Sequence, residues 1–356
     1  MHVEGKYPTG TFRIAFISSS RTDRYLHAMT PLRGILVPLD GSALAEQALG
    51  PAAMLAKAAK TRIRLVLVHQ VPSPPTTPEL VKLYTSIEVA TRRAARDYLL
   101  RQMEVLRRKG CTDVSRVVIT GTPGPEIVKH AAEWDASLVV MSTHGRGALE
   151  RAWLGSVADH VVRNVGVPVL LARPVAEGVR PLVPGGQILV PLDGSQFGEA
   201  ALEPAVELAR LLGAELRLMQ IVRPVQMAMG GAMASGVSYD DVLLTAWQEQ
   251  AREYLDRTAA RLQSDGLRVV TEIVISPLVA NTILEVEESE QSRVVAMATH
   301  GRGGLSRLFL GGVADKVVRG ADCPVLVCPA SRIARRAVKR PAAARRKLAT
   351  VIPNFA

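Results

Sequence analysis

The sequence predicts an α/β protein of two tandem domains, each a doubly wound, five-stranded parallel sheet. The first observation is a repeat: ILVPLDGS at residues 35–42 recurs at 188–195, and STHGRGALERAWLGSVADHVVR at 142–163 returns as ATHGRGGLSRLFLGGVADKVVR at 298–319. The second is that continuous Val, Leu and Ile runs alternate with segments whose apolar residues recur every three or four positions, which is typical of parallel strands separated by helices. Repeats of about 150 residues have the size of independent domains.

Each repeat is expected to run strand, helix, strand, long helix, strand, helix, strand, helix, strand. In the first repeat the strands are predicted at residues 34–39, 63–70, 115–120, 137–142 and 167–172, and the helices at 43–60, 78–108, 125–132 and 157–164. In the second, strands are predicted near 187–192, 215–221, 269–275, 293–298 and 324–328, with a long helix at about 239–264. Right-handed crossovers between these strands make the sheets doubly wound.

The repeats also divide the chain into segments. We expect a disordered extension or mis-assigned start (1–28), since Met29 shortly precedes the first strand, a first domain (29–173), a Pro/Gly-rich linker (174–186), a second domain (187–330) and a disordered basic tail (331–356).

The net charge of +11 belongs mainly to the ends of the chain. Residues 331–356 carry +8 and residues 1–28 carry +2, which leaves +1 on the body between them. A nearly neutral body excludes a general basic binding face, so no specific nucleic acid is expected as a partner. No apolar run approaches the roughly 20 residues that span a bilayer, and the N-terminus lacks a signal pattern. We therefore expect no membrane partner and a cytoplasmic location.

Both repeated motifs follow predicted strands. Open α/β sheets bind ligands beyond the carboxyl ends of their strands, where loops turn into helices. In PLDGS, Asp40 and its counterpart Asp193 stand directly before a helix, so each is either a structural helix cap or a ligand group.

The second motif has the character of a phosphate cradle. A glycine turn at Gly145 is separated by nine residues from Gly155, and Gly155-Ser156 opens a helix at Val157. Two glycine turns and a helix N-terminus can bring backbone N–H groups and a positive dipole toward one anion.

Together these motifs resemble the universal stress protein family, here in tandem form. PLDGS after the first strand, and THGRG with nine residues to Gly-Ser before a VADxVVR helix and a PVLL strand, carry the resemblance over residues 32–173 and 187–330. It implies a Rossmann-like fold of the adenine nucleotide alpha hydrolase-like class that binds ATP.

The resemblance also implies the binding residues. In the first repeat they are Pro38, Asp40, Gln70, Ser142, Gly145, Gly155, Ser156 and Val157. In the second they are Pro191, Asp193, Ile221, Ala298, Gly301, Gly311, Gly312 and Val313. Ser142 replaces a family glycine, and Gly312 replaces the hydroxyl residue. The second repeat has also lost the glycines of its third loop, so the first site is expected to be the better one.

The predicted function is an ATP-binding regulatory module of the stress response without dedicated catalytic machinery. No metal site formed by the protein alone is expected, and Mg²⁺ bound with the nucleotide near Asp40 stays open. The chain has no G-x-x-x-x-G-K-[ST] loop and no second acidic residue placed to hold a catalytic metal. A slow ATPase is the alternative, and a stress protein that acts through protein contacts without nucleotide is a second. The apolar final strands of the two repeats are expected to pair in an intramolecular pseudo-dimer, with a homodimer as a further option.

Overall fold

The computed structural model describes residues 32–71, 75–143, 154–173, 181–224, 239–290, 292–299 and 310–329. The expectations for the N-terminal extension, for the basic tail and for Gly145 and Gly301 lie outside the described residues, as does the first part of the predicted linker.

The first repeat forms a five-stranded parallel sheet with helices on both faces. Its strands are β1 (Gly34–Leu39), β2 (Arg62–His69), β3 (Val114–Thr120), β4 (Leu138–Ser142) and β5 (Val169–Ala172). Its helices are α1 (Ala43–Glu46), α2 (Leu49–Ala59), α3 (Pro78–Arg108), α4 (Pro123–Glu133) and α5 (Ser156–Asn164). The strand order β3-β2-β1-β4-β5, with every neighbouring pair parallel, confirms the predicted doubly wound sheet.

The second repeat has the same topology. Its strands are β6 (Gln187–Pro191), β7 (Glu215–Val222), β8 (Val269–Ile275), β9 (Val294–Ala298) and β10 (Val325–Cys328). Its helices are η1 (Gly198–Ala201, a 3₁₀ turn), α6 (Leu202–Leu212), α7 (Tyr239–Ser264), α8 (Val279–Ser289) and α9 (Gly312–Gly320). The order β10-β9-β6-β7-β8 mirrors that of the first repeat, again with parallel neighbours.

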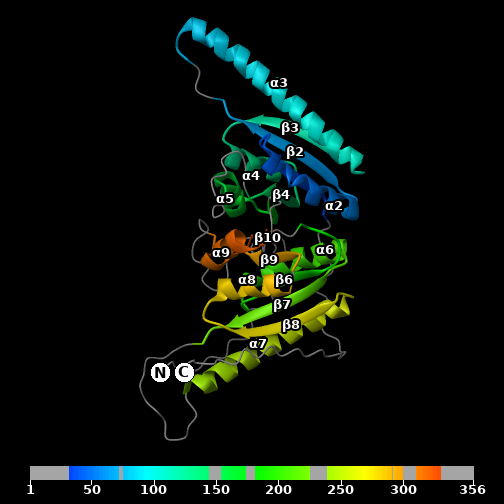
Figure 1. The fold of residues 1–356 in the computed structure, drawn as a ribbon, viewed down its shortest axis with the longest axis vertical. Helices are drawn as coiled ribbons and strands as arrows, with labels where there is room; N and C mark the ends of the chain where they lie inside the picture. The colour runs from blue at the N-terminus through cyan, green and yellow to red at the C-terminus, as the bar shows by residue number, and fades with distance from the viewer. Residues whose placement is uncertain are drawn as a thin grey trace, which may run out of the picture.

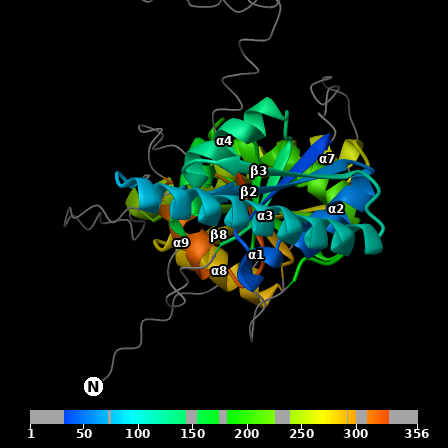
Figure 2. The same ribbon diagram turned by 90° about the horizontal axis from the view of Figure 1, so that it is seen from above.

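The two sheets are joined edge to edge. Strands β5 and β10 pair antiparallel, with Leu170 opposite Leu326, so the strands form one ten-stranded sheet. Figure 1 shows the repeats stacked along the longest axis, with α3 at one end and α7 at the other. Figure 2, seen from above, shows α3 lying across β2 and β3.

Two apolar cores cover the two faces of this sheet. One contains buried residues of α2, α3, α6 and α7, and the other contains buried residues of α4, α5, α8 and α9. Strand residues alternate between the two cores: Ile35 and Val37 belong to the first, and Leu36 belongs to the second. Burial on both faces explains why the strands are continuous apolar runs.

The single helix predicted over residues 43–60 is instead two helices, α1 and α2. Pro51 is the third residue of α2, where its missing N–H has no intrahelical partner in any case. Pro204 occupies the same place in α6, which follows η1. A continuous helix would put each proline in its interior, so the break follows from the prolines, which the apolar periodicity does not detect.

Candidate functional site

A cavity of about 840 Å³ lies at the carboxyl ends of β1, β2 and β4, between α3, α4 and α5. Its wall contains every predicted binding residue of the first repeat that the structure describes: Pro38, Asp40, Gln70, Ser142, Gly155, Ser156 and Val157. The volume falls within the range of small-molecule sites.

Asp40 contributes to the turn that leads from β1 into α1. Its Oδ1 accepts hydrogen bonds from the backbone N of Ser42 at 2.9 Å and from its hydroxyl at 2.6 Å. The Ser42 Oγ in turn accepts from the N of Ala45, which caps α1. Gly41 has φ +86°, a conformation that favours glycine. Asp40 therefore supports the helix cap and also lines the cavity, so the two readings of this residue do not exclude each other.

The same turn recurs in the second repeat. The Oδ1 of Asp193 accepts from the N and the hydroxyl of Ser195 at 3.0 and 2.7 Å, and Gly194 has φ +74°. The Ser195 Oγ accepts from the N of Gly198 at 3.1 Å. Local turn chemistry thus accounts for the Asp-Gly-Ser of both copies, whether or not a ligand is bound.

The N-terminus of α5 forms another part of the cavity wall. Gly155 is its N-cap and has no side chain to cap the helix, and its N–H donates to the carbonyl of Thr143 at 2.9 Å. This bond ties the helix start to the end of β4. The first N–H groups of a helix lack intrahelical acceptors and carry the positive end of its dipole. Together with Ser156, they form a wall that suits an anion.

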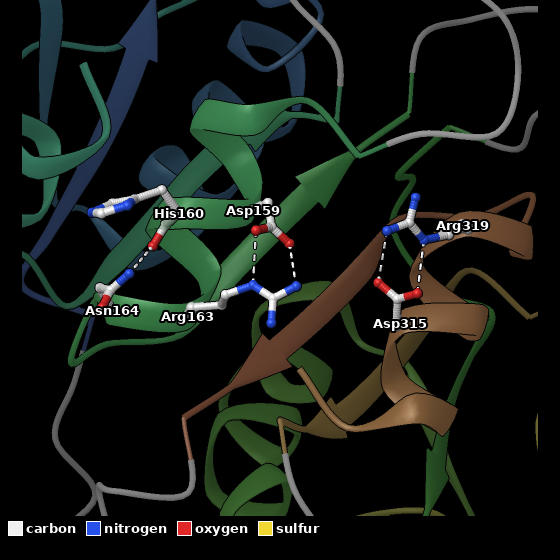
Figure 3. Close-up of polar contacts among 6 residues, drawn as sticks. All are labelled: Asp159, His160, Arg163, Asn164, Asp315 and Arg319. Carbon is white, nitrogen blue, oxygen red and sulfur yellow. Dashed lines mark hydrogen bonds and ion pairs between the residues drawn. The ribbon is translucent and has the colours of Figure 1, made fainter. Parts of the chain in front are cut away.

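Ion pairs at matching positions of α5 and α9 hold the later turns of these helices. Asp159 pairs with Arg163 at 2.6 Å, and Asp315 pairs with Arg319 at 2.8 Å. Figure 3 shows the two pairs on either side of the β5–β10 junction. A hydrogen bond to Asp159 and the nearby charge of Asp315 both raise the pKa of Arg163, although burial opposes them.

Helix α3 supplies a wall that the sequence motifs did not indicate. Five of its residues line the cavity, at spacings of three, one, three and three: Thr91, Ala94, Ala95, Tyr98 and Arg101. The spacing is visible in the sequence, but it does not say that this face of a long helix passes over the carboxyl edge of the sheet.

His69, the last residue of β2, also lines the cavity. Its Nε2 is buried and has no hydrogen-bond partner among the described residues. A buried nitrogen without a partner is costly unless a ligand or water satisfies it. The α5 N-terminus and the Asp40 carboxylate bring backbone donors and a negative charge to the same cavity.

Besides Asp193, most of the predicted residues of the second repeat that the structure describes occupy places that correspond to those of the first. Pro191 ends β6 and Ala298 ends β9, while Gly311 and Gly312 begin α9, followed by Val313. The N of Gly311 donates to the Thr299 carbonyl at 2.9 Å, as Gly155 does to Thr143.

The register of β7 and the space around Gly312 bear on the remaining predicted residues of the second repeat. The expectation that Ile221 corresponds to Gln70 is wrong: in the strand ladders, β7 aligned with β2 places Ile221 at the position of Val68 and Arg223 at the position of Gln70. A Cβ at Gly312 would meet nothing within 4 Å, so space does not require glycine where the first repeat has Ser156.

Each repeat has a second acidic residue near its Asp-Gly-Ser turn, since Glu199 follows Asp193 by six residues as Glu46 follows Asp40. Burial and then the carboxylates of Glu199 and Asp193 raise the pKa of Tyr254 on α7.

Comparisons with known proteins agree with this architecture. The sequence model of the universal stress protein family matches residues 31–173 and 186–329. A universal stress protein of Mycobacterium tuberculosis is 31% identical over 220 residues, which are 60% of this chain and 68% of that protein. A second one from the same organism is 26% identical over 310 residues, covering 83% and 94% of the two chains.

Solved structures share the fold. A universal stress protein from Archaeoglobus fulgidus superposes with a TM-score of 0.58 at 20% identity, over 83% of this chain and 96% of that one. A functionally unknown protein from Pseudomonas aeruginosa has a TM-score of 0.58 at 18% identity, over 88% and 99% of the chains. The family model matches two consecutive segments that together make up most of the chain. The chain therefore belongs to the universal stress protein family and carries two copies of its domain.

Proposed function

We propose that the first repeat binds an adenine nucleotide, ATP in particular, and that the protein is a cytoplasmic regulatory module of the stress response without dedicated catalytic machinery. The observation that carries this proposal is the cavity of about 840 Å³, whose wall combines the N-terminus of α5 with Asp40 and with the polar end of β2. Phosphates suit the first of these elements, and a base and ribose suit the others.

The charges of the wall support a nucleotide that brings its own metal ion. Asp40 is the one carboxylate among the described lining residues. In the described part of the chain, no cluster of three or more His, Cys, Asp or Glu side chains could hold a metal by itself. Mg²⁺ would therefore be held by Asp40 together with phosphate oxygens and water, and would neutralise phosphate charge.

The first site is proposed as the stronger one. Ser156 offers a hydroxyl that Gly312 lacks. One hydrogen bond to a charged phosphate corresponds to roughly a tenfold difference in affinity.

The test is calorimetric titration of the full chain with MgATP. Asp40→Asn keeps an oxygen that can accept from Ser42 and removes the charge, so weaker binding with unchanged melting temperature would assign the carboxylate to the ligand. Gly155→Val places a branched side chain at the cavity wall and should remove most binding.

Asp193→Asn and Gly311→Val are the matched controls in the second repeat, and they should cost less. Binding that survives Gly155→Val and vanishes with Gly311→Val would overturn the ranking of the two sites. The absence of any ATP binding by the wild-type protein would overturn the proposal. If ATP binds and phosphate is released during the titration, the slow ATPase is established instead.

A further inference from the structure

A pair of arginines lies at the amino ends of the strands of the first repeat, opposite the edge that carries the cavity. Arg62 and Arg64 are the first and third residues of β2 and point to the same face. Their guanidinium carbons lie 4.5 and 4.9 Å from the ring centroid of Trp134, the C-cap of α4. Both side chains are half-buried.

Hydrogen bonds fix the orientation of both guanidinium groups. Arg62 donates from Nη2 to the carbonyl of Trp134 at 3.1 Å, and Arg64 donates from Nε to the hydroxyl of Ser115 at 3.1 Å. The Nη1 of Arg62 and both Nη atoms of Arg64 take no part in these bonds. Two guanidinium groups are thus held in place, and each keeps N–H donors that these bonds do not use.

The positive charge of this pair is not neutralised by the described residues. Neither guanidinium has a carboxylate partner within 4.0 Å among them, and the nearby Glu133 contacts Lys129 and His130 instead. Burial and the repulsion of Arg62 lower the pKa of Arg64. Stacking on an aromatic ring fixes two like charges side by side without compensating them.

The second repeat neutralises the corresponding arginine from within the chain. Arg217 is the third residue of β7, as Arg64 is of β2. Its Nη1 and Nη2 lie 2.7 and 2.6 Å from carboxylate oxygens of Glu272 and Glu290. The position of Arg62 is taken by Glu215. Among the described residues, the arginine of the second repeat is therefore paired with carboxylates of its own domain, and the arginines of the first repeat are not.

We propose that Arg62 and Arg64 form a binding site for a phosphate-type oxyanion, either inorganic phosphate or the terminal phosphate of a small molecule. A dianion matches two cations, and its oxygens suit the in-plane N–H groups of guanidinium. The site is separate from the proposed nucleotide cavity, because it lies at the other end of the same strands.

The experiment uses Trp134 as a local reporter in the full-length protein. The chain has three tryptophans, so Trp153→Phe/Trp247→Phe leaves Trp134 as the single fluorophore. Titration with sodium phosphate against sodium chloride at constant ionic strength should give a saturable change in its emission. Arg64→Gln and Arg62→Gln should each weaken the apparent affinity at least about tenfold, the size of a lost charged hydrogen bond.

Arg116→Gln is the matched control, because Arg116 is exposed and its ladder partner is Leu65, so it points to the opposite face from Arg64. It should leave the titration unchanged. Arg64→Lys keeps the positive charge but lacks the planar guanidinium, so it should bind phosphate with intermediate affinity. A graded loss of this kind distinguishes phosphate recognition from a general effect on folding.

The nucleotide cradle is tested in the same assay with Gly155→Val. A Trp134 response that survives this substitution and disappears with Arg64→Gln supports the arginine site, whatever the outcome for ATP. A response that persists in both arginine variants, or that sodium chloride reproduces, would overturn it. If the protein does not bind ATP, the experiment still tests the arginine site, because its probe is inorganic phosphate. Adenosine 5′-monophosphate serves as a second probe and distinguishes a terminal phosphate from free phosphate.

Discussion

Removal of the Arg217 side chain should be far more costly than removal of its counterpart Arg64. The Arg217 side chain is 8% exposed, and it binds Glu272, which is 11% exposed, and Glu290, which is 28% exposed. Its Nε also donates to Gln187 at 2.5 Å. Arg217→Met would leave the Glu272 carboxylate buried without its counter-charge.

The size of the effect follows from this burial. Breaking a buried ion pair by removing one partner costs about 3–5 kcal/mol. Glu290 is partly solvated and recovers water, so we expect the lower end, about 3 kcal/mol. For a unit of 150–250 residues this lowers the melting temperature by roughly 6–12 °C. Arg64→Met strands no carboxylate and should cost about 1 kcal/mol or less, mainly lost stacking and one hydrogen bond.

Differential scanning calorimetry of the full chain measures both variants, and Trp247 fluorescence assigns the transition to the second repeat. The triple variant Arg217→Met/Glu272→Met/Glu290→Gln should recover most of the loss, because apolar replacements of a whole buried network are tolerated. Equal destabilisation by Arg217→Met and Arg64→Met, or no recovery in the triple variant, would refute the reasoning.

Three further predictions rest on local geometry. A Cβ at Gly124 in α4 would lie 2.7 Å from the His160 ring, so Gly124→Ala should cost about 1–3 kcal/mol in urea denaturation, whereas Gly50→Ala meets nothing and should stabilise α2 by up to about 1 kcal/mol. The opposite order would contradict this packing. Burial and a neighbouring arginine lower the pKa of His130, so the unfolded chain takes up its proton first; stability should fall as the pH drops through about 6.5, and the fall should be smaller in His130→Gln. Identical pH profiles would count against that linkage. Gly312→Ser has open space and should strengthen ATP binding in the second repeat without lowering the melting temperature, which calorimetry can check.

The sequence predicted the strands well because parallel strands covered on both faces leave a continuous apolar signature. β1 and β8 occur at the predicted bounds, and α3 and α7 do too. The break between α1 and α2 could not come from periodicity, since apolar residues continue across it, and only the position of Pro51 explains it.

The candidate site was predictable where a motif lies on one loop and not where a wall comes from a distant helix. Asp40, Ser142 and Gly155 follow their strands and meet at one edge, as parallel topology requires. Tyr98 and Arg101 reach the same cavity from α3. Their placement depends on how this helix crosses the sheet, which is a tertiary property.

The antiparallel pairing of β5 with β10 has a consequence for how the protein responds to dilution. Two separate domains that meet through such edges would associate in a second-order reaction, and their contact would be lost at low concentration. Here residues 173–186 join the two repeats in one chain, and a short tether corresponds to an effective concentration in the millimolar range. The contact between β5 and β10 therefore forms to the same extent at low and at high protein concentration. For this reason the β5–β10 contact should not make the melting temperature depend on protein concentration. A cell could change the amount of this protein over a wide range and leave the pairing of its two halves unaltered.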